Sequence, residues 1–473
     1  MAKTIETDIC VIGGGSGGLV VAAGASQMGA KTVLVERAKM GGDCLNYGCV
    51  PSKALIAAGH AAQSARSAGR FGVDATPTVD FGRVHDHVKD VIAHIAPHDS
   101  VARFEALGVE VIQAAARFVS RREIEAAGQR IRARRFVVAT GSRALVPPIP
   151  GLEGVSHFTN ETIFDNAELP DHLIIIGGGP IGMELAQAHR NLGAEVTVVE
   201  MFTALGADDP ELARIATDCL RRQGVEILEN TKVVSVAGED GRVTVSISQH
   251  DQVRALTGSH LMLAAGRRPN IEDLGLDAAG IKTGPSGIIV DRRLRTSNGK
   301  VFAIGDVTGG LQFTHVAGYE AGIVLRNALF RLPAKADYSA IPWVTYTDPE
   351  LAQVGLTEAS ARALHGDIRI LRWPFAENDR AHSERREDGL IKAITTKRGR
   401  VLGAGIVGPN AGDLIQPWTL ALQNKLSVGD MASVVAPYPT LGEVSKRAAG
   451  SYYAKSLFSE RTRRIVRFLS RFG

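Results

Sequence analysis

Residues 8–36, DICVIGGGSGGLVVAAGASQMGAKTVLVE, decide the fold. The segment opens with an apolar run from Asp8 to Ile12, passes through a glycine turn into an apolar helix that we predict to end near Gly29, and closes with a second apolar run ending at Glu36. A strand, a glycine turn, a helix and a second strand form the unit that binds a dinucleotide at the helix N-terminus. We therefore predict an α/β domain with a parallel sheet.

The turn holds Gly13, Gly15 and Gly18 in the G-x-G-x-x-G spacing, and Glu36 follows Gly13 by 23 positions. Glycine lets backbone N–H groups approach a pyrophosphate closely, and an acid at this distance accepts from a ribose hydroxyl. A tight strand-to-helix turn without nucleotide would use the same glycines. The flanking strand, helix and acid together favour nucleotide binding.

A second copy of the unit occupies residues 173–200, LIIIGGGPIGMELAQAHRNLGAEVTVVE. Its glycines are Gly177, Gly179 and Gly182, and Glu200 again lies 23 positions after the first of them. A carboxylate there bonds a free 2′-hydroxyl and repels a 2′-phosphate, and no arginine follows within residues 201–204, so NAD(H) is favoured over NADP(H). Two nucleotide sites in one chain indicate a flavin that exchanges electrons with a nicotinamide.

The domain organisation follows from these two units. Pro147, Pro148, Pro150 and Gly151 form a stiff linker between them, and residues 267–270 mark the return. After about Pro342 the glycine fingerprints stop, so a separate α+β domain begins there. We divide the chain into residues 1–150, 151–270, 271–340 and 341–473.

Composition excludes several classes of protein. The chain has 473 residues, 45% hydrophobic and 22% charged, which is typical of a globular protein. Four cysteines are too few for a secreted disulfide framework. No apolar run reaches the ~18 residues of a membrane span, and residues 1–8 are too polar for a signal peptide. We expect a cytoplasmic protein.

Charge is concentrated at the C-terminal end. Residues 455–473 have a net charge of +5, whereas the whole chain has a net charge of +4, so the preceding residues have a net charge of −1. This near-neutral charge does not indicate a nucleic-acid binder. On a helical wheel this tail separates an apolar face from a basic one; the apolar residues are Ile465, Phe468, Leu469 and Phe472, and the basic ones are Arg463, Arg464, Arg467 and Arg471. We expect the apolar face to pack on its own domain; the alternative is docking to an anionic membrane surface or a partner.

The segment GGDCLNYGCVPSK, residues 41–53, places Cys44 and Cys49 five positions apart. In a regular helix their Cα atoms would be roughly 8–9 Å apart, beyond the ~7 Å limit for a disulfide. If they pair, the helix must be distorted, and Gly48 and Pro51 permit that. The alternatives are two small buried residues or half of a zinc site, although no second Cys/His pair lies at ligand spacing. Cys10 and Cys219 are expected to be inert core residues.

Three histidines, His87, His94 and His98, share one face of a predicted helix. Pro97 interrupts that helix, and no acidic ligand stands at a suitable spacing. We favour a solvated helix and predict no metal site.

Several motifs together resemble the flavoprotein pyridine nucleotide-disulfide oxidoreductases, the family of dihydrolipoamide dehydrogenase, glutathione reductase and mercuric reductase. They are the segment at 41–53, VVATGSRALVPPIPG at 137–151, GGGPIGMELAQA at 177–188, AAGRRPN at 264–270, VFAIGDVTG at 301–309 and IPWVTYTDPELAQVGLT at 341–357. The resemblance covers nearly the whole chain. It implies that residues 1–150 and 271–340 bind FAD, that 151–270 bind NAD, and that 341–473 form the interface domain of a homodimer with active sites shared between chains.

The resemblance also implies roles for residues of this chain. Cys49 would be the thiol beside the flavin and Cys44 the thiol that exchanges with substrate as a thiolate, so a positive neighbour or helix N-terminus should lower the pKa of Cys44. Lys53 would pair with Glu184 near the flavin. By the same motifs, FAD would be bound by Thr140, Gly141 and Asp306, and NAD by Gly266.

The chain departs from the family pattern near its end. The disulfide-reducing members carry His-Pro-Thr-x-x-Glu, whose His–Glu pair acts as acid and base, whereas this chain has Tyr438 and Glu443 at the corresponding positions. Tyrosine, with an ordinary pKa near 10, is a poor base at neutral pH. Mercuric reductase resembles this chain in having a tyrosine there, but it also has a C-terminal cysteine pair, and no cysteine follows Cys219 here.

Three functions therefore stay open. The first is an NAD(P)H-dependent FAD enzyme that passes electrons through Cys44 and Cys49 to or from a small-molecule or protein thiol/disulfide or a thiol-bound metal, in the manner of mercuric reductase. The second is dihydrolipoamide dehydrogenase itself. The third is a non-catalytic flavin redox sensor.

Overall fold

The computed structural model of the chain describes residues 4–472 and divides into two compact units. The first comprises the residues up to Met201 together with Thr231–Asp337, and the second comprises Phe202–Asn230 together with Tyr338 onward. Residues 1–3, part of the polar start, and Gly473, the last residue of the basic tail, lie outside the described residues. The division predicted at residues 150, 270 and 340 stays a prediction.

The first unit contains the two nucleotide folds. Its helices are α1 (Ser16–Gln27), α2 (Gly42–Asn46), α3 (Cys49–Arg66), α4 (Phe81–Ile95), α5 (Val101–Ala106), α6 (Pro180–Leu192), α8 (Leu276–Ala279) and α9 (Thr314–Ala328). Its strands are β1 (Thr4–Ile12), β2 (Thr32–Glu36), β3 (Val109–Gln113), β4 (Arg117–Ser120), β5 (Glu123–Ala126), β6 (Gln129–Val138), β7 (Ser142–Ala144), β8 (His172–Ile176), β9 (Glu195–Val199), β11 (Lys232–Glu239), β12 (Arg242–Gln249), β13 (Gln252–Gly258), β14 (His260–Leu263), β15 (Arg267–Pro269), β16 (Thr283–Gly284), β17 (Gly287–Ile288) and β18 (Val301–Ala303).

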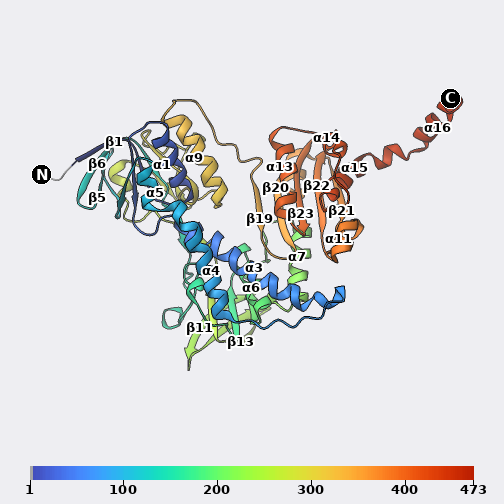
Figure 1. The fold of residues 1–473 in the computed structure, drawn as a ribbon, viewed down its shortest axis with the longest axis horizontal. Helices are drawn as coiled ribbons and strands as arrows, with labels where there is room; N and C mark the ends of the chain where they lie inside the picture. The colour runs from blue at the N-terminus through green and yellow to red at the C-terminus, as the bar shows by residue number, and fades with distance from the viewer. Residues whose placement is uncertain (1–3, 473) are drawn as a thin grey trace. The chain divides into compact units, whose positions relative to one another are not determined.

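The larger sheet has the strand order β3-β2-β1-β6-β5-β4, with β18 also pairing β6. Strand β1 runs parallel to β2 and β6, and residues 9–12 are buried on both faces, which explains why this strand reads as a continuous apolar run. Helices α1 and α9 lie side by side against the sheet (Figure 1). The prediction from residues 8–36 is confirmed, with the helix ending at Gln27, two residues before the glycine expected to end it.

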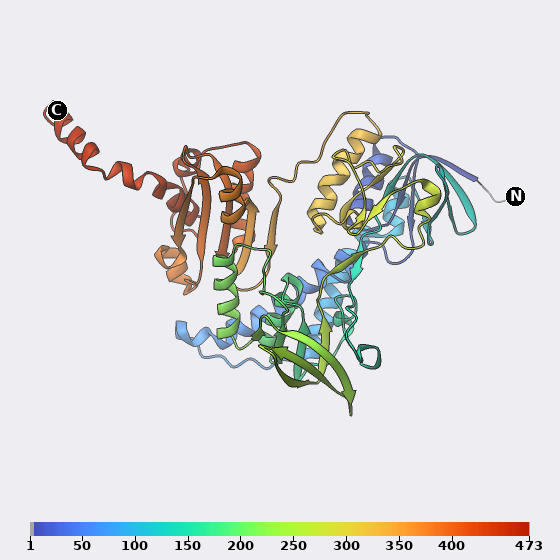
Figure 2. The ribbon, with the colours of Figure 1, turned by 180° about the vertical axis from the view of Figure 1, so that it is seen from behind.

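The second nucleotide fold repeats this order. Strand β8 is parallel to β9 on one side and to β14 on the other, and α6 connects β8 with β9. Strands β7 and β15, which carry the outgoing and returning connections, pair antiparallel, with Arg267 opposite Ala144. The antiparallel sheet β11-β12-β13 extends from this part of the unit (Figure 2).

The second unit is an antiparallel sheet covered by helices, as predicted for the α+β C-terminal domain. Its elements are α7 (Pro210–Arg222), β10 (Glu226–Leu228), β19 (Pro342–Thr345), β20 (Glu350–Gly355), α10 (Glu358–His365), β21 (Ile368–Pro374), α11 (Asp379–Glu384), β22 (Leu390–Thr396), β23 (Val401–Gly408), α12 (Ala411–Leu414), α13 (Gln416–Gln423), α14 (Val428–Ser433), α15 (Glu443–Leu457) and α16 (Glu460–Leu469). The sheet order is β19-β20-β23-β22-β21. Its core includes the fully buried Trp418, whose indole N–H donates to Ser445 Oγ at 3.0 Å.

A buried lysine attaches α7 to this sheet. Lys392 on β22 is 4% exposed and lies 2.9 Å from Asp209, 2.9 Å from Glu211 and 2.8 Å from Glu358. Three carboxylates around one ammonium compensate its burial. The contact explains why Phe202–Asn230 clusters with the C-terminal residues although the sequence places it after the second nucleotide turn.

No helix among residues 4–472 is long and apolar enough to cross a membrane.

Candidate functional site

The glycines of the first turn have two different reasons to be glycine. A Cβ on Gly13 would lie 2.3 Å from the carbonyl oxygen of Ala139, and one on Gly18 would lie 1.9 Å from that of Gly13, so these two are required by packing inside the chain. A Cβ on Gly15 would meet only Gly42 Cα at 3.8 Å. Gly15 therefore leaves the backbone open at the N-terminus of α1, where a pyrophosphate fits.

The second turn repeats this arrangement. Gly177, at φ +115°, would place a Cβ 2.4 Å from Ala264 O, and Gly182 would place one 2.0 Å from Gly177 O. Gly179 has open space within 4 Å. Two turns with the same open second glycine fit two dinucleotides.

Each turn keeps its acid at the same place. Glu36 accepts hydrogen bonds from the N–H groups of Gly14 and Ala38, and Glu200 accepts from Gly178 N–H at 2.7 Å. Both carboxylates thus stand at the turn, where a ribose hydroxyl could donate to them. Gly266, at φ +119°, accepts through its carbonyl from Leu145 N–H at 2.9 Å and so joins the predicted return segment to residues 142–145.

The two cysteines of residues 41–53 lie on separate helices. Helix α2 ends before Tyr47, and α3 begins at Cys49 after Gly48, whose φ of −129° and ψ of −109° break the helical path. The helix is broken between the two cysteines, and their pairing, from which a distortion was predicted, stays a prediction. Both cysteines carry free thiols, and each thiol shifts the pKa of the other.

The first nucleotide turn and the cysteines are one structural piece. Gly41 N–H donates to Gly14 O at 2.9 Å, and Gly15 and Gly41 form an isolated parallel β-bridge. A flavin nucleotide on the turn would therefore have the redox segment beside it. Here the residues present fit FAD, which in such a position exchanges electrons between a nicotinamide and a dithiol.

The pKa values of the two thiols are shifted in opposite directions. The hydrogen bond from Cys44 lowers the pKa of Cys49 to about 6, assisted by Thr314, whose Oγ1 lies 3.4 Å from Cys49 Sγ, and by the charge of Lys53. The same hydrogen bond raises the pKa of Cys44, and burial adds to this. The expectation that Cys44 would have the lowered pKa is wrong, because the positive neighbour and the N-terminus of α3 both lie at Cys49.

Lys53 and Glu184 pair as the resemblance implies. Lys53 Nζ lies 2.7 Å from Glu184 Oε2, which joins α3 to α6 and so connects the redox helix to the helix of the second nucleotide turn. The Glu184 side chain is 7% exposed and the Lys53 side chain 38%. The charge of Lys53 also lowers the pKa of Cys49.

Asp306 lies in a polar cluster that the sequence did not identify in full. Ser142 Oγ donates to Asp306 Oδ2 at 2.5 Å, Arg267 Nε donates to Ser142 Oγ at 2.7 Å, and Arg267 also lies 3.2 Å from Asp43 of the redox segment. Burial raises the pKa of Asp306, and Ser142 opposes the rise. Ser142 and Arg267 stand inside the quoted motifs, but their contacts span 164 and 125 residues of chain, so no spacing in the sequence indicates them.

Thr140 and Gly141 hold the crossing between the two nucleotide folds. Thr140 Oγ1 donates to Asn270 O at 2.8 Å, Asn270 Nδ2 donates to Thr140 O at 3.0 Å, and Gly141 has φ +67°. These contacts fix the backbone of residues 140–142 next to the Asp306 cluster.

Tyr438 and Glu443 belong to the second unit, and the structure gives Tyr438 a partner that the sequence did not. The Tyr438 hydroxyl donates to Asp379 Oδ2 at 2.9 Å, and the ring is 69% exposed. This hydrogen bond raises the pKa of Tyr438, and the charges of Asp379 and Glu443 act in the same direction. The phenol is therefore held in its protonated form, as a donor and not as a base.

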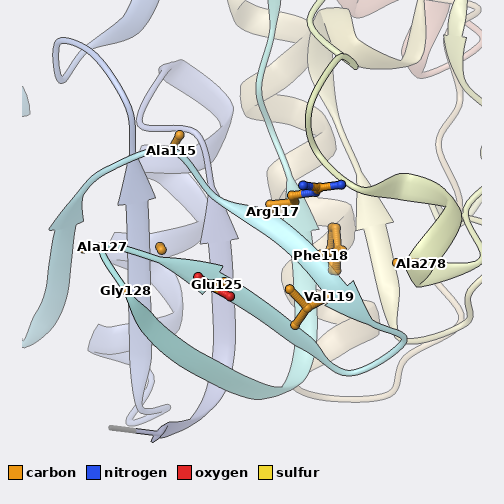
Figure 3. Close-up of a pocket in the computed structure, with 9 residues that line it drawn as sticks. Ala115, Arg117, Phe118, Val119, Glu125, Ala127, Gly128 and Ala278 are labelled. Carbon is orange, nitrogen blue, oxygen red and sulfur yellow. The ribbon is translucent and has the colours of Figure 1, made fainter. Parts of the chain in front are cut away.

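A pocket elsewhere in the first unit carries none of the predicted residues. It lies beside β4, β5 and α8 (Figure 3). Its lining includes Arg117, Phe118, Glu125 and Ala278, none of which belongs to a nucleotide turn or to the redox segment. Within residues 4–472 no group of three or more His, Cys, Asp or Glu residues could hold a metal ion.

The fold and site together define a class: an oxidoreductase with two dinucleotide turns and a dithiol attached to the first. The chain matches the pyridine nucleotide-disulphide oxidoreductase model over residues 7–321 and the dimerisation domain of the same enzymes over 341–449. It is 35% identical over 447 residues to mercuric reductase of Bacillus cereus, covering 94% of this chain and 71% of that protein. It is 35% identical over 454 residues to dihydrolipoyl dehydrogenase of Geobacillus stearothermophilus, covering 94% and 96%.

Among solved structures, the Cu(II) complex of the HOCl-induced flavoprotein disulfide reductase RclA from Escherichia coli is similar at a TM-score of 0.85 and 28% identity, covering 95% of this chain and 100% of that chain. The protein therefore belongs to the pyridine nucleotide-disulphide oxidoreductase family. It is an FAD-dependent enzyme that acts on a sulfur group with NAD(P) as its partner.

Proposed function

We propose that this enzyme passes electrons from NADH through Cys44 and Cys49 to a thiophilic metal ion, with Hg(II) and Cu(II) as the candidate acceptors. The observation that carries the proposal is the hydrogen bond from Tyr438 to Asp379 at the position where disulfide-reducing relatives keep an acid–base histidine. A phenol that donates a hydrogen bond to a carboxylate keeps its proton at neutral pH, so it does not serve as a base there.

The thiols support a metal acceptor for a related reason. Cys44 holds its proton because its partner Cys49 is the more acidic thiol. A dihydrolipoamide or glutathione exchange at Cys44 would require a base to move protons between sulfur atoms. A soft metal cation instead deprotonates a coordinating thiol by binding to it, and the proton leaves to solvent.

The residues of the chain then have distinct tasks. Cys44 and Cys49 bind the cation as thiolates, Lys53 and Thr314 stabilise the charge on Cys49, and Glu184 fixes Lys53. Per NADH oxidised to NAD⁺ and H⁺, two electrons reduce one Hg(II) to Hg(0) or two Cu(II) to Cu(I). When bound, FAD supplies the relay between the nicotinamide and the metal.

The names of similar proteins also support this proposal. Mercuric reductases are among the curated relatives, and the RclA structure was obtained with Cu(II). Within residues 1–473 the metal would be received at Cys44 and Cys49, because Cys10 and Cys219 are buried.

The second candidate is dihydrolipoyl dehydrogenase. The fraction of each relative that the chain matches favours this candidate. The chain spans 96% of the Geobacillus stearothermophilus dihydrolipoyl dehydrogenase but only 71% of the Bacillus cereus mercuric reductase. In that reaction Tyr438 and solvent would replace the histidine. The third candidate, a redox sensor, would reduce its flavin without turning over any acceptor.

An acceptor panel separates the three functions. The holoenzyme is mixed anaerobically with NADH and, in separate assays, with Hg(II), Cu(II), lipoamide or glutathione disulfide, and NADH loss is followed. We expect turnover with a metal ion to exceed turnover with either disulfide. Faster turnover with lipoamide would establish the second candidate, and flavin reduction without any turnover would establish the third.

We further propose that the enzyme is a homodimer that prefers NADH. Residues 341–449 match a dimerisation domain, and Glu200 stands at the second turn where a 2′-phosphate would be repelled. Light scattering should give twice the mass of the chain. Steady-state kinetics should give a lower KM for NADH than for NADPH. Glu200→Gln should reduce the difference between the two KM values.

A further inference from the structure

The last helix of the chain, α16, leaves its apolar face uncovered. The apolar residues Ile465, Phe468 and Leu469 of α16, and Phe472 shortly after its end, are 49%, 57%, 59% and 74% exposed. No residue of α16 is buried, and it extends away from the rest of the second unit (Figures 1 and 2). The expectation that this face packs on its own domain is therefore wrong, because the helix makes no burying contact with the sheet or its covering helices.

The helix is nevertheless well formed. Ser459 caps it by accepting from Thr462 N–H, and the rings of Phe468 and Phe472 contact each other edge to face with centroids 5.2 Å apart. Helical spacing places Ile465, Phe468 and Leu469 on one face, and the ring contact connects Phe468 to Phe472.

The opposite face is basic. It carries Arg463, Arg464 and Arg467, with Arg471 shortly after the helix, and the single acidic residue of the tail, Glu460, lies 3.1 Å from Arg463 and 3.4 Å from Arg467. Both pairs are exposed, so they neutralise little of the charge that the helix presents. The match to the dimerisation domain ends at residue 449, so the family fold does not account for this helix.

We propose that α16 docks the enzyme on an anionic lipid surface, with the apolar face in the headgroup region and the arginines against lipid phosphates. A short helix with aromatic residues on one face and arginines on the other has the composition of an interfacial helix. Anionic lipid complements both faces, because it offers negative charge above an apolar layer.

Other occupants match only one face. A nucleic acid would take the arginines and leave the phenylalanines in water. A second copy of the tail would cover the phenylalanines but bring two rows of arginine together, and the remainder of the chain, with a net charge of −1, offers no general acidic complement.

Vesicle co-sedimentation tests the proposal with the full-length holoenzyme. The vesicles contain either phosphatidylcholine alone or phosphatidylcholine with about a third phosphatidylglycerol. We expect binding to the anionic vesicles that weakens in high salt. Arg464→Gln with Arg471→Gln, and separately Phe468→Ser with Phe472→Ser, should each weaken binding at least about tenfold, since both faces contribute.

Phe330→Ser with Arg331→Gln is the matched control, because both residues are exposed on the first unit and lie outside the tail. The control should bind as the parent does, and none of these variants should change NADH-driven turnover, so the test is independent of the acceptor. Two results would each overturn the proposal: no binding to vesicles, or equal binding to vesicles with and without anionic lipid. A third is the combination of two observations, namely that heparin abolishes vesicle binding and that the variant Phe468→Ser with Phe472→Ser binds vesicles as the parent does.

Discussion

The redox segment around Cys44 and the C-terminal segment around Tyr438 differ in how many of the groups implied by the family resemblance they contain. The first contains Cys44 and Cys49, each of which shifts the pKa of the other, Lys53 paired with Glu184, and Thr314 at the more acidic thiol. The second holds a tyrosine whose hydroxyl donates to Asp379.

Under the proposed function, this difference means that electron transfer at the thiols does not depend on the side chain at residue 438. The dithiol depends on contacts within one unit, and a change at residue 438 leaves them intact. An enzyme can therefore keep its relay from nicotinamide to thiols while the acceptor changes to one that needs no base.

The largest effect is expected at Cys44. Cys44→Ser removes the thiol that meets the acceptor while Cys49, Lys53 and both nucleotide turns remain. We expect acceptor turnover to fall at least ~10³-fold, as for loss of a nucleophile, while NADH still bleaches the flavin in an anaerobic titration. Cys219→Ser, at a buried cysteine of the second unit, is the matched control and should keep turnover. Unchanged turnover in Cys44→Ser would remove the dithiol from the reaction.

Lys53→Met tests whether the redox segment depends on its ion pair. It leaves the Glu184 carboxylate, 7% exposed, without its ammonium. Removing one partner of a buried pair costs ~3–5 kcal/mol, and because Lys53 is partly exposed we expect a loss of about 1–3 kcal/mol in the free energy of unfolding. Urea denaturation measures it.

The control is the double variant Lys53→Met with Glu184→Gln, which removes the charge left behind. It should recover at least half of the loss. Equal destabilisation in the single and double variants would mean that Lys53 contributes by packing and not by charge.

Tyr438→His tests the second side of the comparison. A histidine there would stand near Asp379 and Glu443 and have an ordinary pKa near 6.5, so it could act as a base. We expect about a tenfold gain in lipoamide or glutathione disulfide turnover, below the ~10²–10⁴-fold of an evolved acid–base group. Tyr438→Phe should leave metal reduction unchanged. If the histidine variant shows no gain, the tyrosine is not what restricts the acceptor.

The smallest effect is expected at Thr314. Thr314→Val removes the hydroxyl 3.4 Å from Cys49 and should raise the pKa of Cys49 above about 6 by one pH unit or less. Alkylation of Cys49 requires the thiolate, so its rate increases as pH rises through the pKa. In the variant this increase moves to higher pH, and alkylation at pH 6 slows a few-fold.

Mass spectrometry of the Cys49 peptide after iodoacetamide treatment at several pH values gives the midpoint. Thr314→Ser keeps the hydroxyl and should match the parent. A midpoint that does not move in Thr314→Val would leave Cys44 and Lys53 as the groups that acidify Cys49.

The sequence predicted those parts of the site that depend on a few consecutive residues, and it did not predict contacts between distant residues. The turns at Gly13 and Gly177, and the helix break at Gly48, follow from the conformational needs of a few consecutive residues. The contact of Thr314 with Cys49 spans 265 residues of chain, and that of Asp379 with Tyr438 spans 59. Neither has a spacing that the sequence could display.

The sequence by itself determined the two nucleotide folds, the dithiol and the amphipathic character of the tail, because strand and helix periodicity and glycine requirements are properties of short segments. Only the tertiary structure decided which thiol is acidic, because the answer depends on which cysteine begins a helix and has Lys53 and Thr314 beside it. It also decided that Tyr438 donates to Asp379 and that no other part of the second unit buries the apolar face of α16. Hydrogen-bond partners and burial exist only once distant segments have been brought together.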